Sequence, residues 1–166
     1  MFGHFLEAQE PVYETVLAEL RAGEKRTHWM WFIFPQLKGL GRSAAAERFG
    51  LADLAAARAY LAHDILGARL RECTGLVNAI GARAAEADIV AAKRAGDNSA
   101  VPRTAHEIFA TPDDLKFRSS MTLFAHADAK EPLFREALDK YFGGRGDPLT
   151  EELLGRPAAT SPAPPP

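Results

Sequence analysis

One histidine stands beside the most apolar stretch of the chain and is flanked by side chains that bind anions and rings. His28 directly precedes six consecutive apolar residues that begin at Trp29 and include both tryptophans of the protein. Lys25 stands three residues before His28, and Gln36 follows the run after one proline. Because imidazole gains and loses a proton near neutral pH, His28 is the candidate for proton transfer.

The aromatic run has two interpretations. Trp29 or Trp31 lines a pocket and stacks on a planar ligand, or the whole run is a buried core segment. An indole N–H needs a hydrogen-bond partner, which favours the edge of a cavity for one of the two. His28 is either a proton donor and acceptor or a hydrogen-bonded structural residue, and Gln36 binds a ligand or caps backbone groups. In a helix, Lys25, His28 and Trp29 would share one face.

A second polar cluster lies later in the chain and comprises Lys116, Arg118, Ser119 and Ser120. In a helix, Lys116 and the two serines lie on one side, and Arg118 lies on another. A guanidinium binds phosphate or carboxylate with its planar fork, or Arg118 forms an ion pair with Asp114 four residues earlier. Two adjacent hydroxyls within a helix are unfavourable by propensity, so they indicate a polar cavity or close helix packing.

Composition and charge exclude several classes of protein. Lys+Arg number 20 and Asp+Glu 22, so a net charge of -2 leaves no basic field for nucleic acid or an anionic membrane. One cysteine excludes an internal disulfide and a multi-cysteine metal site. Gly-rich phosphate loops and paired histidines are absent from the sequence, so we expect neither a metal nor a cofactor. Without a secretory signal or a membrane-length apolar run, we expect a cytoplasmic protein.

Helical periodicity dominates the segments that must position these residues. A length of 166 residues with 47% hydrophobic residues suits one domain, which we place over 1–154. Amphipathic spacing and capping residues predict helices over 11–20, 53–63, 66–80, 111–125, 133–142 and 147–154. The Ala- and charge-rich stretch 81–104 predicts a short exposed helix and a loop. Residues 155–166 contain five prolines and predict a disordered tail.

Four ordered blocks of this sequence resemble the family catalogued as domain of unknown function 1810. The strongest is KRTHWMWFIFPQLKGLGRS over 25–43, and the others are F..AQ over 5–9, the helix over 59–73, and IF…DDLKFRSSMTLFA over 108–125. The resemblance implies a multihelical, all-α fold, and therefore the helical form of 29–34, but implies no activity. Two features depart from the family pattern: an inserted segment, roughly 81–103, and Asp64 where proline is usual.

Two hypotheses about function follow. In the first, a pocket binds a small anionic, planar ligand of the nucleotide or ADP-ribose type. The pocket lies between the blocks 25–43 and 108–125, which we call the two signature segments. The ring would stack on Trp29 or Trp31, and the anion would be held by Lys25, Arg118, Ser119 and Ser120. Gln36 and Lys116 are further candidate ligand-binding residues. HFLEAQ over 4–9 is similar to the HYFQAQ stretch of NADAR-type ADP-ribose-processing proteins, which agrees with this ligand class. In the second, the protein is a non-enzymatic interaction module whose signature residues only stabilise the fold.

Overall fold

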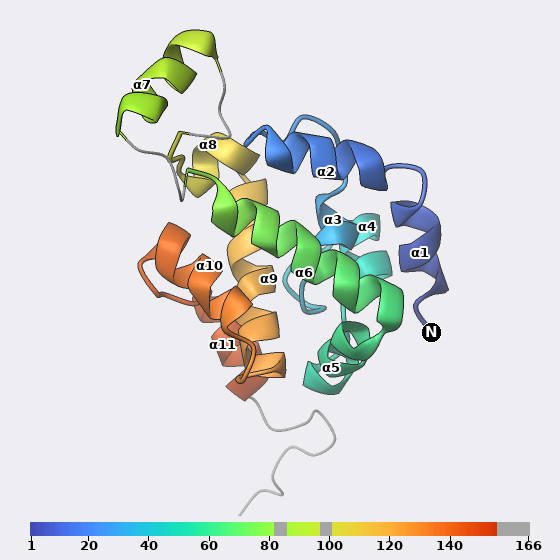
Figure 1. Ribbon diagram of the computed structural model, residues 1–166. Helices are drawn as coiled ribbons and strands as arrows, with labels where there is room; N and C mark the ends of the chain where they lie inside the picture. Colours follow the sequence, from blue (N-terminus) through green and yellow to red (C-terminus); the bar gives the residue numbers. More distant parts are fainter. Residues whose placement is uncertain (82–85, 97–100, 156–166) are drawn as a thin grey trace, which may run out of the picture.

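A computed structural model describes residues 1–81, 86–96 and 101–155, and all regular secondary structure in them is helical (Figure 1). The helices are α1 (Gly3–Gln9), α2 (Tyr13–Arg21), α3 (Met30–Ile33), α4 (Ala44–Phe49), α5 (Leu54–Ala62), α6 (Asp64–Ala79), α7 (Glu86–Ala95), α8 (Ala105–Phe109), α9 (Asp113–Ala127), α10 (Pro132–Phe142) and α11 (Pro148–Gly155). The predicted all-α fold is confirmed. Within the described ranges, none of these helices has the length and apolar character needed to cross a membrane.

Local signals define several helix ends as the sequence predicts. The side chains of Ser43 and Asp53 accept the backbone N–H three residues further on and begin α4 and α5. Gly143 adopts the left-handed conformation with φ 61° and ends α10. These ends depend on residues within one turn of each helix, which is why the sequence predicts them.

The start of α9 differs from its prediction. The helix predicted over 111–125 begins two residues later, at Asp113, and Pro112 before it makes no side-chain capping bond. Thr111 therefore lies outside the helix, and its hydroxyl donates to Asp114 at 3.4 Å. The two first-turn carboxylates, Asp113 and Asp114, do lie at the positive end of the helix dipole as expected.

The aromatic run forms α3 at the centre of the fold. Its helical form is confirmed, but the helix spans only Met30–Ile33, because Pro35 has a fixed φ and no N–H to continue it. Helix α3 contacts α1, α4, α6 and α9. Its flanking residues Trp29 and Phe34 are buried, so most of the run is core.

The two longest helices, α6 and α9, organise the packing around α3. Helices α5 and α10 each contact both of them, while α8 and α11 pack against α9 (Figure 1). On the inner face of α9, the Phe117 ring lies 4.8 Å from the Phe109 ring and 5.0 Å, edge-on, from the Phe34 ring. These ring contacts hold the two signature segments against each other.

The segment predicted to be an insertion, roughly 81–103, contains α7, which projects from the body of the other helices in Figure 1. It is the short helix expected in 81–104, and its described side chains, such as that of Val90, are exposed. Part of the loop expected in 81–104, at 97–100, and the expected tail after Gly155 lie outside the described residues, so both stay predictions.

Candidate functional site

One buried carboxylate holds the segment between α2 and α3. Glu19 is 7% exposed, and its Oε1 accepts the backbone N–H groups of Arg26 and Thr27 and the indole N–H of Trp29 at 3.2 Å. Its Oε2 accepts the hydroxyl of Thr27 at 2.6 Å. Burial raises the pKa of the Glu19 carboxyl, but the hydrogen bonds from Thr27, Arg26 and Trp29 outweigh burial and hold the pKa below its usual value.

The segment that this anchor holds is not helical. Lys25, His28 and Trp29 would share one face only in a helix, and the backbone around them is irregular up to the start of α3. The Glu19 carboxylate supplies the hydrogen bonds that another helical turn would have made. A charged group on the preceding helix can therefore shape a loop.

The two tryptophans have different environments. Trp29 is 1% exposed, its N–H bonds to Glu19, and it belongs to the core. Trp31 is half-buried, and the ammonium of Lys116 lies 4.0 Å from the centre of its ring. The core interpretation therefore describes Trp29, and the cavity-edge interpretation describes Trp31.

A carboxylate at the start of α9 connects the two signature segments. Asp113 binds Lys25 at 2.8 Å through Oδ2 and Lys116 at 3.2 Å through Oδ1. The Lys25 ammonium also donates to the carbonyl of Thr27 at 2.6 Å. Two of the predicted anion-binding lysines thus meet in space around one acidic residue.

Trp31 and Lys116 separate two hollows in the surface. The larger, the Trp31 hollow, has a volume of about 250 Å³ and is lined by Trp31, Gln36, Leu40, Gly41, Pro112, Leu115, Lys116, Ser119, Asp147 and Leu149. The smaller, the lysine hollow, has a volume of about 120 Å³ and is lined by Lys25, His28, Trp29, Met30, Trp31, Phe32, Asp113 and Lys116. The two share the face of the molecule between α3 and the start of α9.

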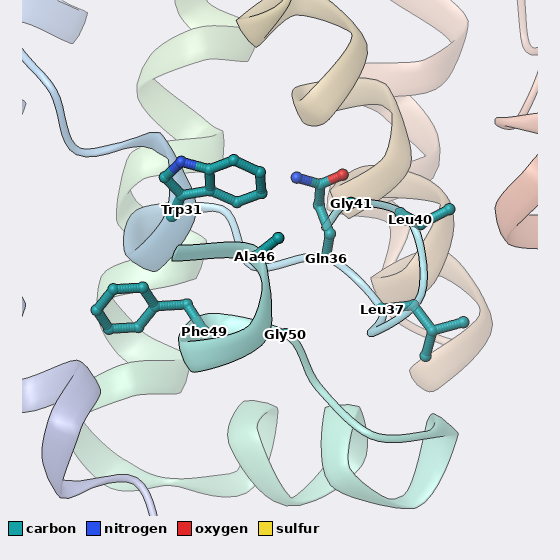
Figure 2. A pocket seen from close by; sticks show the side chains of 8 residues that line it. All are labelled: Trp31, Gln36, Leu37, Leu40, Gly41, Ala46, Phe49 and Gly50. Atoms are coloured by element: carbon teal, nitrogen blue, oxygen red, sulfur yellow. The ribbon is translucent and has the colours of Figure 1, made fainter. Parts of the chain in front are cut away.

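Gln36 is directed toward the same space as Trp31, in a small recess behind the Trp31 hollow (Figure 2). The recess has room for about one water molecule, at 10 Å³. Gln36 is 8% exposed, and its side-chain amide hydrogen-bonds to no group of the described residues. The main-chain carbonyl oxygen of Gln36 accepts the N–H of Leu51 at 2.8 Å, which fixes the backbone.

The rim of the Trp31 hollow is apolar. Leu115 and Leu149 are 55% and 44% exposed, and both line the hollow. Gly41 brings the loop after Gln36 close to the indole, because a Cβ built there would lie 3.6 Å from the Trp31 ring and 3.0 Å from the Ala46 side chain. Large exposed apolar side chains that gather at a concavity are typical of a ligand or partner site.

The charges of the lysine hollow leave a small positive excess. The two positive charges of Lys25 and Lys116 exceed the single negative charge of Asp113 by one when His28 is neutral. In the Trp31 hollow, the carboxylate of Asp147 is already engaged at the start of α11, where it accepts the N–H and the hydroxyl of Thr150.

Two predicted site residues lie outside both hollows. Arg118 donates to the carbonyl of Arg145 at 3.0 Å, rather than to Asp114, and stands over the Phe142 ring. Ser120 is fully buried in α9, and its hydroxyl has no partner in the described parts of the chain. Residues three apart on a helix share a face, so Ser119 follows Lys116 into the Trp31 hollow while its neighbours on either side point elsewhere.

His28 is exposed at the lysine hollow, and its ring hydrogen-bonds to none of the described residues. It is therefore open to solvent and to a ligand, as a proton-transfer group must be. The structure, over the residues that it describes, brings no three His, Cys, Asp or Glu side chains into an arrangement that could hold a metal ion.

The segment 4–9, which is similar to HYFQAQ, lies in α1 and packs within the fold rather than at either hollow. Gln9, in α1, donates to the carbonyl of Phe32 at 2.8 Å and to the hydroxyl of Tyr60 at 3.1 Å, and accepts from Arg69 at 3.3 Å. It lines neither hollow. Its role in this fold is to brace the rear of α3.

Sequence reasoning missed several residues that line the Trp31 hollow, namely Leu40, Gly41, Asp147 and Leu149. Leu40 and Gly41 lie in the loop shortly after Gln36, whereas Asp147 and Leu149 lie at the start of α11, far in sequence from both clusters. For Asp113 a signal did exist, because a carboxylate three residues before Lys116 in a predicted helix favours an ion pair.

Comparison with known proteins identifies the family. The model of a family described as "Protein of unknown function (DUF1810)" matches residues 2–95 and 93–154. The chain belongs to this family. A crystal structure of the conserved hypothetical protein Rv1873 from Mycobacterium tuberculosis is 48% identical to this DUF1810 chain, with a TM-score of 0.80 over 93% of this chain and 96% of that one. No curated protein matches the chain.

Membership in DUF1810 agrees with the resemblance found in the sequence, and the related crystal structure supports the single all-α domain. Neither description names an activity or a ligand. The function must therefore be argued from the site between α3 and α9.

Proposed function

We propose that this DUF1810 protein binds a small planar ligand with one anionic group at the Trp31 and lysine hollows. The observation that carries the proposal is the meeting of three unlike groups at one concavity: the Trp31 ring, the Gln36 amide and the Lys116 ammonium. A ring face, a neutral hydrogen-bonding group and a cation together suit a flat ligand with an acidic substituent. Packing alone does not require the three to converge.

The ring of the ligand would occupy the Trp31 face that Lys116 now covers. A cation over an aromatic ring at a partly exposed site is worth about 0.5–1 kcal/mol. Stacking of a base on an aromatic side chain is worth about 1–3 kcal/mol. A planar ligand would therefore displace Lys116 from the ring, while the ion pair with Asp113 keeps the ammonium nearby.

The size and charge of the site favour a small ligand. Drug-sized ligands occupy pockets of at least about 300 Å³, somewhat larger than the Trp31 hollow. The single excess positive charge of the lysine hollow suits one carboxylate or one phosphate better than a pyrophosphate. We therefore favour a ligand of the size of a nucleoside monophosphate over an intact ADP-ribose.

His28 would be the proton-transfer group if the bound ligand reacts. It stands at the lysine hollow beside Lys25, where the anionic end of the ligand would lie. Arg118 takes no part in this arrangement, because its guanidinium braces the loop before α11.

The proposal is tested with phenyl phosphate and nucleoside monophosphates, which all combine a ring with one phosphate. At a ligand concentration of 100 times Kd, binding stabilises the folded state by about 2.7 kcal/mol, which raises the Tm of a domain of this size by about 5–10 °C. Tryptophan fluorescence should change as well, since the probe contacts Trp31 while Trp29 is buried.

Two variants and one control make the result specific. Trp31→Ala and Lys116→Met should each weaken binding at least about tenfold, since each removes one of the converging groups. Lys130→Met, which removes an exposed lysine outside both hollows, should leave binding unchanged. The proposal fails if no ring-bearing phosphate raises the Tm of the wild type, or if both site variants bind as tightly as the control.

A further inference from the structure

The amide of Gln36 differs from that of the other glutamine in the chain. Gln9 is 1% exposed, and both ends of its amide are hydrogen-bonded, to Phe32, Tyr60 and Arg69. Gln36 is 8% exposed, yet its amide bonds to no group that the structure describes. The amide atoms of Gln36 are not among the fully buried polar atoms that lack a partner, so the amide stays accessible in the hollow and can pair with a group that enters it.

The main chain holds this amide in a fixed place. On one side of Gln36, Pro35 restricts the backbone. On the other side, the Gln36 carbonyl and the Lys38 N–H bond to the N–H and carbonyl of Leu51, each at 2.8 Å. The amide is therefore presented to the Trp31 hollow without a further ordering cost for the backbone.

The other polar side chains of the Trp31 hollow are less able to form a pair of hydrogen bonds with an uncharged group of a ligand. The hydroxyl of Ser119 already donates its proton to the carbonyl of Leu115 at 3.0 Å. The Asp147 carboxylate accepts two hydrogen bonds from Thr150, and Lys116 only donates. Among the residues that line the hollow, Gln36 is the side chain with a neutral donor and a neutral acceptor next to each other.

From these observations we infer that the Trp31 hollow selects a ring whose edge carries a hydrogen-bond donor beside an acceptor, as nucleobases and ring carboxamides do. Gln36 pairs with that edge through its oxygen and its NH₂, while Trp31 stacks on the ring face. The inference rests on the proposed function and adds to it the class of ring. An aromatic phosphate without such an edge would stack on Trp31 and bind the lysines through its phosphate, but it would not form the two hydrogen bonds with Gln36.

Isothermal titration calorimetry with three probes tests the inference. The rings of adenosine and uridine 5′-monophosphates have a hydrogen-bond donor beside an acceptor on one edge. Phenyl phosphate combines a ring and a phosphate but lacks this donor and acceptor. We expect the wild type to bind at least one nucleotide about tenfold or more tightly than phenyl phosphate. Gln36→Met should reduce this ratio to near one.

Two further variants keep the test decisive. Lys130→Met, which removes an exposed lysine outside both hollows, should preserve the ratio. Gln36→Asn keeps a polar amide at the site but withdraws it by one methylene, and it should lose the ratio even if Gln36→Met does not fold. The inference is overturned if the wild type has no preference, or if the ratio survives in the Gln36 variants. In either case, binding of phenyl phosphate would leave the proposed function standing; if no probe binds, both are wrong.

Discussion

Replacing Glu19 with alanine should destabilise the protein and loosen the candidate site together. The carboxylate accepts four hydrogen bonds, from the N–H groups of Arg26 and Thr27, the hydroxyl of Thr27 and the indole of Trp29. The backbone donors lie in exposed residues and can bond to water instead. The indole cannot, since Trp29 is 1% exposed.

The expected cost follows from these contacts. A buried donor left without a partner costs about 1–3 kcal/mol, and a hydrogen bond to a charged group contributes about 1.5–3 kcal/mol. With the backbone donors rescued by water, Glu19→Ala should lower the free energy of unfolding by about 3 kcal/mol. Glu19→Gln retains the Oε1 acceptor for the three N–H groups but loses the charge and the acceptor of the Thr27 hydroxyl, and it should cost about half as much.

The pH dependence separates the charge from the packing. The pKa of Glu19 in the folded protein lies below its value of about 4.3 in an unfolded chain. Its contribution is therefore present above that pH and is lost as the pH falls through the folded pKa. The difference in stability between wild type and Glu19→Gln should be largest near neutral pH and should shrink as the solution becomes more acidic.

Urea unfolding in a Trp31→Phe background measures both effects, because Trp29 is then the remaining tryptophan. We expect the native emission of Trp29 to change in Glu19→Ala, because its N–H loses the buried carboxylate as partner. A cost below about 1 kcal/mol for Glu19→Ala would refute the role of Glu19 as the anchor of this loop. A Glu19→Gln difference that does not change with pH would refute the charge argument.

Two further predictions address packing and charge. Gly67→Ala should lower the free energy of unfolding by about 2 kcal/mol in chemical denaturation, because the new Cβ would lie 2.1 Å from the carbonyl oxygen of Leu61. Gly75→Ala in the same helix, where no atom lies within 4 Å, should stabilise the protein by up to about 1 kcal/mol; equal effects of the two would contradict the steric argument. Asp113→Asn should lower the free energy of unfolding by about 1–2 kcal/mol, because two ion pairs are lost. It also frees both lysines of the lysine hollow and should tighten the binding of phenyl phosphate at least threefold. Weaker binding in calorimetry would contradict the charge balance given above.

Much of the fold was predictable because its signals are local. The cap of α5 by Asp53 and the end of α10 at Gly143 depend on atoms within one helical turn. The helix expected over 66–80 has a continuous apolar face, and α6 (Asp64–Ala79) buries it. Short elements were harder: α1 has no capping hydrogen bond, and α8 contains five residues, although its Thr104–Glu107 capping box was a usable signal.

The candidate site was predictable in its parts but not in its geometry. Lys25, Trp31, Gln36, Lys116 and Ser119 were all expected to contribute, and all line one of the two hollows. Sequence spacing could not show that the Arg118 guanidinium bonds to a carbonyl beyond α10. The partner of a long side chain depends on which distant segment packs beside it.

The order of residues alone was enough to establish an all-α protein and the positions of its longer helices. Helix formation and capping involve hydrogen bonds across three or four residues, and these are written in consecutive letters. Packing decided the rest: a carboxylate on α2 holds the loop before α3, and the contact between α3 and α9 places the Lys116 ammonium over the Trp31 ring. Such contacts join residues far apart in the chain, and their energies depend on distance and burial, which arise when the helices come together.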